Sequence, residues 1–280
     1  MGVPVNGAGL LAGRNLLVTG VVTPDSIAWA TAVAAVAHGA NLVLSAPERD
    51  LELARQTAAG LDAPVVALDV TSDDDWSSVT DVVRSDFGHL DGALHAVAWS
   101  PRDGLAGPMA GPPPERLGLS FDTSVSSYAR LGGVLADLAP TPVPGKTAGA
   151  SLVGLTFDAS RAWGIYNWMG VMKTALEATN RFLARDLGPR GVRTNLVAAG
   201  PLHTRAANAI PGFDTLLDSW ARAPLGWDAT DATPVADAIC FLFSDLSRAV
   251  TGQVIHVDGG HSAVQGDAPA DGADGTVGGT

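Results

Sequence analysis

The stretch NLLVTGVVTPDSIAWATAVAAVAHGANLVLSA, residues 15–46, carries the pattern that decides the fold. Two short apolar runs, at 15–20 and 41–46, flank a helical pattern at 26–40. Strands that are apolar on both faces and alternate with helices are typical of a parallel sheet covered on both sides. We therefore predict an α/β fold, a doubly wound Rossmann-like domain with a seven-stranded parallel sheet and helices on both faces. The other five apolar runs, also separated by helical patterns, lie at 64–70, 92–98, 151–157, 192–200 and 252–260.

Three segments depart from this alternation. Residues 204–226 interrupt it after the sixth strand, and a long insertion at the carboxyl end of a strand is where a substrate lid is expected. The Gly- and Pro-rich segment 101–118 predicts a surface loop over one rim of the sheet. Residues 266–280 contain little besides Gly, Ala and Asp, which predicts a disordered tail. With no internal linker or repeat, residues 1–265 are predicted to form a single Rossmann-fold domain.

Composition and charge narrow the classes of function. A formal charge of −12 argues against binding to nucleic acid or to an anionic membrane surface, because no basic stripe is present. The single cysteine, Cys240, has no partner for an internal disulfide, and the N-terminus lacks a signal pattern. No apolar run is long enough to span a membrane. We expect a soluble cytoplasmic protein, and no metal site because the 6 histidines lack ligand spacing.

The turn after the first strand predicts a phosphate-binding site. Gly20 ends the strand, and Thr23 followed by Pro24 predicts the N-cap and first position of the next helix. Free amides at that helix start, near Ile27, together with the Ser26 hydroxyl, would hold a pyrophosphate. The glycine fingerprint of dinucleotide-binding folds (G-x-G-x-x-G) is absent, so this turn alone is also compatible with an ordinary α/β connection.

Three further strand ends carry candidate dinucleotide contacts. Asp69 and Val70 close the third strand where an adenine ring would stack, although Asp69 also fits a turn or N-cap. After the sixth strand, backbone groups of Leu202 are placed for a nicotinamide carboxamide and the Thr204 hydroxyl for the pyrophosphate. After the second strand, Glu48 suits a ribose hydroxyl and the neighbouring Arg49 suits a 2′-phosphate. We expect NADH, with NADPH as the alternative.

A tyrosine and a lysine stand out because both residue types are scarce. The chain has 2 tyrosines, and of its 17 Lys and Arg residues only Lys146 and Lys173 are lysines. Tyr166 and Lys173 are about two turns apart in a helix predicted at 165–187. A phenol can stabilise an enolate oxygen, while an ammonium can hold ribose hydroxyls and favour a more acidic tyrosine. Spacing alone leaves open the alternative of a solvated lysine and a half-buried core tyrosine.

Taken in order, the motifs of the chain resemble a known family. LVLSAPER, LHAVAWSP, VGLTFDASRAWGIYNWMGVMKTALE, VRTNLVAAGPLHT and TGQVIHVDGG are similar to segments of the enoyl-acyl-carrier-protein reductases of the short-chain dehydrogenase/reductase superfamily. The mycobacterial and actinobacterial branch that isoniazid targets is the nearest in pattern. The resemblance covers about residues 9–264. Its most specific part is a lysine seven residues after the tyrosine, where ordinary superfamily members have a lysine four residues after it.

The resemblance implies an enzyme of fatty-acid elongation. It would use NADH to reduce the 2,3 double bond of trans-2-enoyl thioesters of acyl carrier protein or CoA, as a homotetramer. Tyr166 would assist at the carbonyl and Lys173 would bind the cofactor ribose, with Phe157 as the aromatic residue beside the substrate. The residues implied to line the substrate pocket are Phe157, Trp163, Tyr166, Trp168 and Met169.

The chain departs from the family pattern after the fourth strand. Where the family commonly has His-Ser-Ile-Gly, this chain has His95 followed by the cofactor-side residues Ala96, Val97 and Ala98. Loss of the serine hydroxyl and the added Ala98 methyl predict weaker NADH binding. The lid is also about ten residues shorter than in the mycobacterial members, which predicts shorter acyl substrates.

Two other functions remain as alternatives. A ketone or alcohol dehydrogenase of the same superfamily needs a lysine four residues after the tyrosine and a serine about thirteen before it. Gly170 and Val153 occupy those positions. A non-catalytic nicotinamide-binding protein is the second alternative, and the presence of both Tyr166 and Lys173 argues against it.

Overall fold

The computed structural model describes residues 9–141 and 149–264, and these contain one seven-stranded sheet. Every paired strand is parallel, and the strand order is β3-β2-β1-β4-β5-β6-β7. The predicted fold class and all seven predicted strands are confirmed. The strands are β1 Asn15–Thr19, β2 Asn41–Ala46, β3 Val65–Ala67, β4 Gly92–His95, β5 Ser151–Thr156, β6 Arg193–Ala199 and β7 Val254–Val257. The predicted tail at 266–280 lies outside the described residues.

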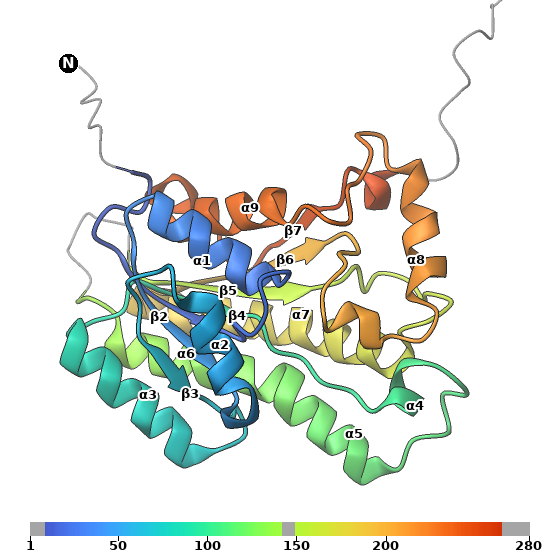
Figure 1. Cartoon of the computed structure of the whole chain (residues 1–280), viewed down its shortest axis with the longest axis horizontal. Coiled ribbons are helices and arrows are strands. Elements are labelled where there is room, and N and C mark those ends of the chain that lie inside the picture. The colour runs from blue at the N-terminus through green and yellow to red at the C-terminus, as the bar shows by residue number, and fades with distance from the viewer. Residues whose placement is uncertain (1–8, 142–148, 265–280) are drawn as a thin grey trace, which may run out of the picture.

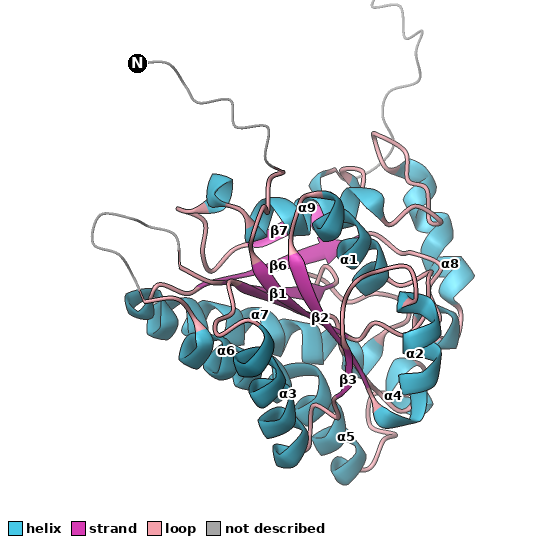
Figure 2. Ribbon diagram, turned by 60° about the vertical axis from the view of Figure 1, so that its left-hand side comes forward, coloured by secondary structure: helices cyan, strands magenta, loops and turns pink. Residues whose placement is uncertain are grey.

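The helices lie in two layers, one on each face of the sheet (Figures 1 and 2). One layer contains α1 and α9, which pack on each other, together with α2. The other contains α3, α6 and α7. The α-helices are α1 Ile27–Ala37, α2 Leu51–Ala58, α3 Asp73–Asp86, α4 Arg102–Leu105, α5 Pro114–Phe121, α6 Ser127–Leu138, α7 Asn167–Leu187, α8 Phe213–Ser219 and α9 Thr233–Phe243. The chain thus doubly winds the sheet as predicted.

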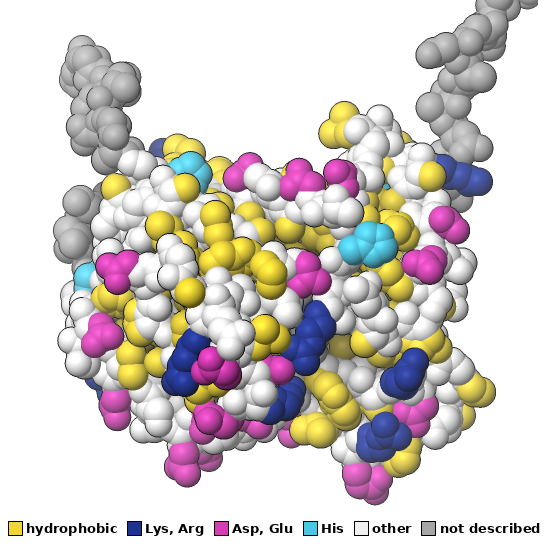
Figure 3. Space-filling view, viewed as in Figure 1, with side chains coloured by type: hydrophobic (Ala, Val, Ile, Leu, Met, Phe, Trp, Pro, Cys, Tyr) yellow, Lys and Arg dark blue, Asp and Glu magenta, His cyan; other side chains and the backbone are white. Residues whose placement is uncertain are grey.

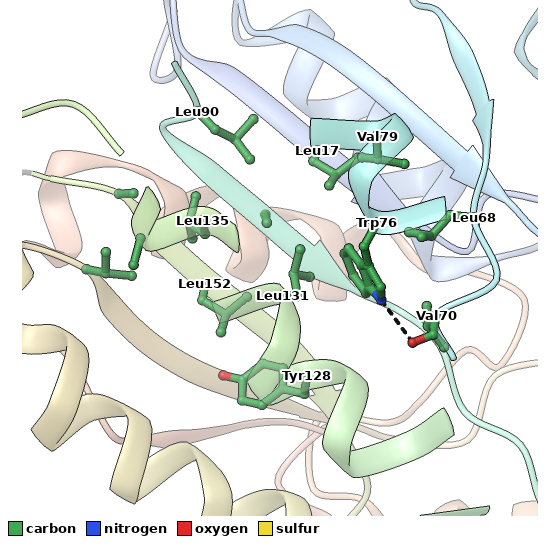
Figure 4. Packing of buried hydrophobic residues seen from close by; sticks show 14 of the residues in the cluster. Leu17, Leu68, Val70, Trp76, Val79, Leu90, Tyr128, Leu131, Leu135 and Leu152 are labelled. Atoms are coloured by element: carbon green, nitrogen blue, oxygen red, sulfur yellow. Dashed lines mark hydrogen bonds between the residues drawn. The ribbon is translucent and has the colours of Figure 1, made fainter. Parts of the chain in front are cut away.

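A separate buried cluster of apolar side chains fills the space on each face of the sheet. In the cluster under α3 and α6, the Trp76 indole lies near Leu68 and donates a hydrogen bond of 3.0 Å to the Val70 carbonyl (Figure 4). This bond ties the end of β3 to α3 while the ring stays buried. The two clusters together hold the sheet rigid, so the loops at its carboxyl edge start from fixed positions.

Two helix starts differ from the prediction. The N-cap of α1 is Ser26, not Thr23, because the Ser26 hydroxyl accepts from the Trp29 amide and its backbone is extended. Thr23 instead closes a separate turn by accepting a hydrogen bond from the Ser26 amide. Helix α7 begins at Asn167, so Tyr166 precedes the helix instead of lying within it. The predicted surface loop at 101–118 also contains α4 and the start of α5.

Residues 9–141 and 149–264 contain neither a candidate membrane-spanning helix nor a candidate metal-ligand cluster. No helix there is long and apolar enough to cross a membrane. No group of three or more His, Cys, Asp or Glu side chains there is placed to hold a metal ion.

Tyr128→Phe tests a polar link between α6 and α7 that lies inside the core. The fully buried Tyr128 hydroxyl donates to the Asn180 side-chain oxygen at 2.9 Å. Its removal leaves that oxygen without its donor, so we expect a loss of about 1–3 kcal/mol in the free energy of unfolding, measured by urea titration. Ser78→Ala, which removes an exposed helical hydroxyl, should change it by less than about 0.5 kcal/mol. Equal stability of Tyr128→Phe and the unsubstituted protein would contradict the packing described.

Candidate active site

The predicted site residues gather at the carboxyl edge of the sheet. This is the edge toward which β5 and β6 point in Figure 1, facing α4 and α8. The order of the strands reverses direction between β1 and β4, and in open α/β sheets such a switch point creates the ligand crevice.

Gly20 brings the ends of β1 and β4 close together. Its φ is +78°, and a side chain there would begin 2.5 Å from the Ala96 carbonyl oxygen. Thr19 joins the same two segments, since its hydroxyl donates to the Leu94 carbonyl at 2.9 Å and accepts from the Ala96 amide at 3.2 Å. Only glycine satisfies both the backbone conformation and the close approach at position 20. Ala96 and Val97 therefore lie directly beside the turn, while Ala98 is exposed.

The start of α1 offers backbone amides but not the predicted hydroxyl. The first amides of an α-helix have no partner within the helix, and Ser26 caps only that of Trp29, which leaves those of Ile27 and Ala28. The Ser26 hydroxyl itself donates to the Thr23 carbonyl at 2.8 Å. In this structure, therefore, the Ser26 hydroxyl uses its proton in a hydrogen bond within the turn and does not offer it to a ligand.

The adenine side of the site has one buried and one exposed residue. Val70 is buried, whereas Asp69 is exposed and its carboxylate accepts from the amide and hydroxyl of Thr71, 2.9 and 2.7 Å away. These hydrogen bonds lower the pKa of Asp69. Asp69 thus adopts the turn role that its sequence also allowed.

An ion pair that the sequence did not predict connects two sides of the crevice. Arg205, at the start of the lid, lies 3.0 Å from Asp50, which follows β2. Strands β1, β4 and β5 separate β2 from β6, so the pair joins segments far apart along the edge. Asp50 is also 3.5 Å from Arg49, the residue considered for a 2′-phosphate. Acidic, basic and hydrophobic side chains are mixed on this face of the molecule (Figure 3).

Tyr166 has an unusual backbone. Its φ of +89° makes it the only non-glycine residue with a positive φ among residues 9–141 and 149–264. A bulky residue in the left-handed region costs about 1–3 kcal/mol, and such residues cluster at functional sites. The Tyr166 amide is held by the Leu105 carbonyl at 2.8 Å, and its carbonyl accepts from the Gly170 amide at 2.9 Å. Burial raises the pKa of Tyr166, opposite to the expected acidification, so its phenol keeps its proton.

Lys173 lies two turns along α7 and, unlike the half-buried Tyr166, is buried. Its ammonium donates to the Leu155 carbonyl at 2.8 Å, its only hydrogen bond within the described part of the chain. Burial lowers the pKa of Lys173 to about 8, and the nearby negative charge of Glu177 offsets part of this effect. The sequence's alternative of a solvated lysine is therefore wrong. An ammonium with three donors and one acceptor retains donors for a ligand.

Phe157 joins Tyr166 to a group of aromatic rings under the lid. Its ring centre is 5.1 Å from that of Tyr166 and 5.0 Å from that of Trp163. Trp220, from the segment that follows α8, lies 5.6 Å from Phe157 on another side. The structure thus brings together three of the five predicted substrate residues and adds Trp220, which the sequence analysis missed.

The other two predicted substrate residues lie elsewhere. Met169 is buried in the cluster beneath the sheet, and Trp168 packs against that cluster. The Trp168 indole donates to the Met109 carbonyl at 2.7 Å, and the Asn167 amide side chain donates to the Gly107 carbonyl at 2.6 Å. With the Leu105 contact, these bonds fasten the start of α7 to segment 105–109. Trp168 therefore holds Tyr166 in place through the backbone.

The turn after β6 is fixed and still leaves a hydroxyl proton available. Leu202 is buried, and the Trp227 indole donates to the Pro201 carbonyl at 2.7 Å. The Thr204 side-chain oxygen accepts from the Ala207 amide at 3.1 Å. Because this bond uses only a lone pair, the Thr204 hydroxyl remains a donor, as its predicted role requires.

A buried histidine near the site was also missed. His95 contacts the Ser127 hydroxyl at 2.7 Å, and Ser127 donates its own proton to the Thr123 carbonyl. His95 must therefore donate through Nε2, which leaves Nδ1 as a buried acceptor with no partner among the described residues. Burial lowers the pKa of His95 to about 3, with a further contribution from the charge of Lys173, so the ring is neutral.

These residues fit a dinucleotide. The cradle at Gly20 admits no side chain, the first amides of α1 face a phosphate position, and the Lys173 ammonium has donors to spare. An all-parallel sheet in this order with such a site is the arrangement of the short-chain dehydrogenase/reductase class.

Comparison with known proteins identifies the family within that class. The model of the enoyl-(acyl carrier protein) reductase family matches residues 20–262, and the chain belongs to this family. A Mycolicibacterium smegmatis protein named enoyl-acyl-carrier-protein reductase (NADH) is 41% identical over 271 residues, covering 91% of this chain and 98% of the relative. A Mycobacterium avium relative of the same name is 40% identical, again over 91% of this chain and 98% of its own length. A Bacillus cereus relative is 34% identical, covering 90% and 98%. The predicted family is confirmed.

Gly20→Ala tests the cradle. We expect the substitution to lower the free energy of unfolding by about 1–3 kcal/mol, since alanine is strained at positive φ and its methyl meets the Ala96 carbonyl. Gly133→Ala in α6 is the matched control, because nothing lies within 4 Å of its added methyl and no positive φ is required. It should stabilise by about 0.5–1 kcal/mol in the same urea titration. A neutral Gly20→Ala would refute the tight approach of β1 to β4.

Proposed function

We propose that this protein reduces the 2,3 double bond of trans-2-enoyl thioesters, carried on acyl carrier protein or CoA, with NADH in fatty-acid synthesis. The observation that carries the proposal is a half-buried, protonated Tyr166 in ring contact with Phe157, with the buried Lys173 ammonium two turns along α7. Membership of the enoyl-(acyl carrier protein) reductase family supports it, as do relatives named as NADH enzymes.

Different residues around the crevice would bind different parts of the dinucleotide. The amides of Ile27 and Ala28 and the Thr204 hydroxyl would hold the pyrophosphate. Lys173 would donate to the ribose hydroxyls, and the turn at Leu202 would meet the carboxamide. Asp69 and Val70 would flank the adenine, and the short side chains of Ala96, Val97 and Ala98 would leave room beside the ring and phosphates.

The chemical step needs a hydrogen-bond donor, not a base. When bound, NADH would supply a hydride to the β-carbon of the enoyl group, and the electron pair of the double bond would move toward the thioester oxygen. Tyr166 would donate its O–H to that oxygen and stabilise the developing negative charge, as an oxyanion hole does. A proton from solvent water would then add to the α-carbon and give the saturated thioester. The raised pKa of Tyr166 suits this role, because the phenol stays neutral until charge develops on the oxygen.

The two alternative functions lack support of this kind. A ketone or alcohol dehydrogenase needs a lysine four residues after the tyrosine, and Gly170 at that position adds no side chain to the site.

We further propose that NADH is preferred over NADPH, since Arg49 lies beside Asp50, which also pairs with Arg205. A single domain over residues 1–265 with a lid at 204–226, a cytoplasmic location and a homotetrameric assembly complete the proposal.

Tyr166→Phe tests the role of the phenol. With NADH and 2-butenoyl-CoA, kcat should fall by about 10²–10³-fold, because the donor to the oxyanion is lost. The affinity for NADH and the melting temperature should stay nearly unchanged. Oxidation of NADH is followed at its absorbance maximum, and the unsubstituted protein is also given a 3-ketoacyl-CoA. Turnover of the ketoacyl compound alone would establish the dehydrogenase alternative, and turnover of neither compound the non-catalytic one.

Lys173 predicts a pH dependence for cofactor binding. The ammonium form binds the ribose, and its pKa of about 8 means that the charge is present below pH 8 and is lost above it. The dissociation constant of NADH, measured by fluorescence, should therefore be about tenfold larger at pH 9 than at pH 6.5. Lys173→Met should bind weakly at both pH values, without this dependence. A constant affinity of the unsubstituted protein from pH 6.5 to 9 would contradict this role.

A further inference from the structure

Three rings from distant parts of the sequence lie face to face under the lid. Trp163 precedes α7, Trp220 follows α8, and His261 is in the short 3-10 helix His261–Ala263 at the end of the described chain. The Trp163 and Trp220 ring centres are 5.3 Å apart at 26°, and those of Trp220 and His261 are 4.0 Å apart at 19°. We refer to these three rings as the aromatic stack.

The aromatic stack borders the reaction site. Phe157 is in ring contact with Tyr166 and with both tryptophans of the stack. The Trp220 indole nitrogen lies 2.8 Å from the point where a side chain on Gly200 would begin, directly before the turn at Leu202. The stack is therefore in contact both with the aromatic neighbour of Tyr166 and with the backbone of the turn expected to meet the nicotinamide.

The position of the stack determines which end of a substrate meets it. The carrier end of an enoyl thioester must leave toward solvent, because acyl carrier protein and the CoA nucleotide are too large to enclose. The alkyl end is then directed inward past Phe157. Trp220 is only 3% exposed, and its indole N–H has no partner among the described residues. Apolar groups are in contact at about 4.0–4.5 Å, so an alkyl chain does not fit between Trp220 and His261.

His261 is held firmly in place. The Asp258 carboxylate accepts from the Gly260 and Ser262 amides, each at 2.9 Å, and so fixes the turn on both sides of the ring. The Leu225 amide donates to the Gly259 carbonyl at 3.0 Å, which fastens the end of the lid to the same turn. The outer face of the aromatic stack is thus closed by the last described element of the chain.

Resting on the proposed function, we propose that the aromatic stack of Trp163, Trp220 and His261 is the end wall of the acyl site and restricts the enzyme to short 2-enoyl chains. Trp163 and His261 are specificity-determining residues: they touch the alkyl end of the substrate or support the ring that does. Phe157 orients the reacting end, and the stack stops the chain beyond it.

The test compares kcat/KM for 2-butenoyl-, 2-octenoyl- and 2-dodecenoyl-CoA in the full chain. The unsubstituted protein should prefer the butenoyl and octenoyl substrates. Trp163→Ala and His261→Ala should each shift the dodecenoyl-to-butenoyl ratio upward by about tenfold or more, since each methylene accommodated in an apolar pocket changes selectivity by about 10-fold or more. The gain should come mainly from the longer substrate.

Two control variants make the result specific. Trp163→Phe keeps a ring in the stack and should leave the ratio within about threefold of the original, less than the change expected for one methylene. His38→Ala removes a half-buried histidine at the opposite end of α1 and should leave it unchanged. Melting temperatures identify any variant that is unfolded. Trp163→Ala and His261→Ala are independent tests of the same proposed end wall.

The possible failures are distinguishable. If the unsubstituted protein reduces no enoyl thioester of any length, the proposed function is wrong. If it reduces them but prefers dodecenoyl-CoA, or if folded Trp163→Ala and His261→Ala keep its length profile, the end-wall proposal alone is overturned.

Discussion

The contact between the ends of β1 and β4 is the constraint on which the site depends. Thr19 bridges the two strands through its hydroxyl, and Gly20 then turns away in a conformation and a space that exclude a side chain. This contact lies at the reversal of strand order, where the sheet opens its crevice. Because the two strand ends are locked together, the start of α1 and the segment from Ala96 flank the same short gap. A narrow gap beside the free amides at the start of α1 thus arises from sheet pairing without the usual set of glycines.

Burial sets the charge states around this crevice. Removing a group from water disfavours its charged form, so Tyr166 and His95 stay neutral and Lys173 is a weaker base than a surface lysine. A neutral phenol suits a reaction in which negative charge appears only during hydride addition. The surrounding structure offsets the conformational strain at Tyr166. Hydrogen bonds accepted by the carbonyl groups of segment 105–109 hold Tyr166 in a left-handed conformation that an isolated chain would avoid.

The lid is part of the same structure. It is tied to the turn after β6 at one end and to the turn at Gly259 at the other, and between them it places Trp220 against Phe157. Sequence analysis predicted a lid at 204–226 and, from the family resemblance, assigned Trp163, Trp168 and Met169 to the pocket. On α7 the side chains of Trp168 and Met169 pack toward the cluster beneath the sheet and toward segment 105–109. Of these three residues, Trp163 has the ring contact with Phe157.

The sequence by itself determined the alternation of strands and helices, the parallel sheet and the family, since periodicity and motif spacing are local properties of the chain. It also identified Tyr166, Lys173 and Phe157 as a group. Only the tertiary structure decided that Lys173 is buried and that Asp50 meets Arg205 across the crevice. Only the tertiary structure likewise shows that the rings of Trp220 and His261 stack. Such contacts join segments far apart in the chain, and the sheet order and the ties of the lid fix them, so no local pattern of residues predicts them.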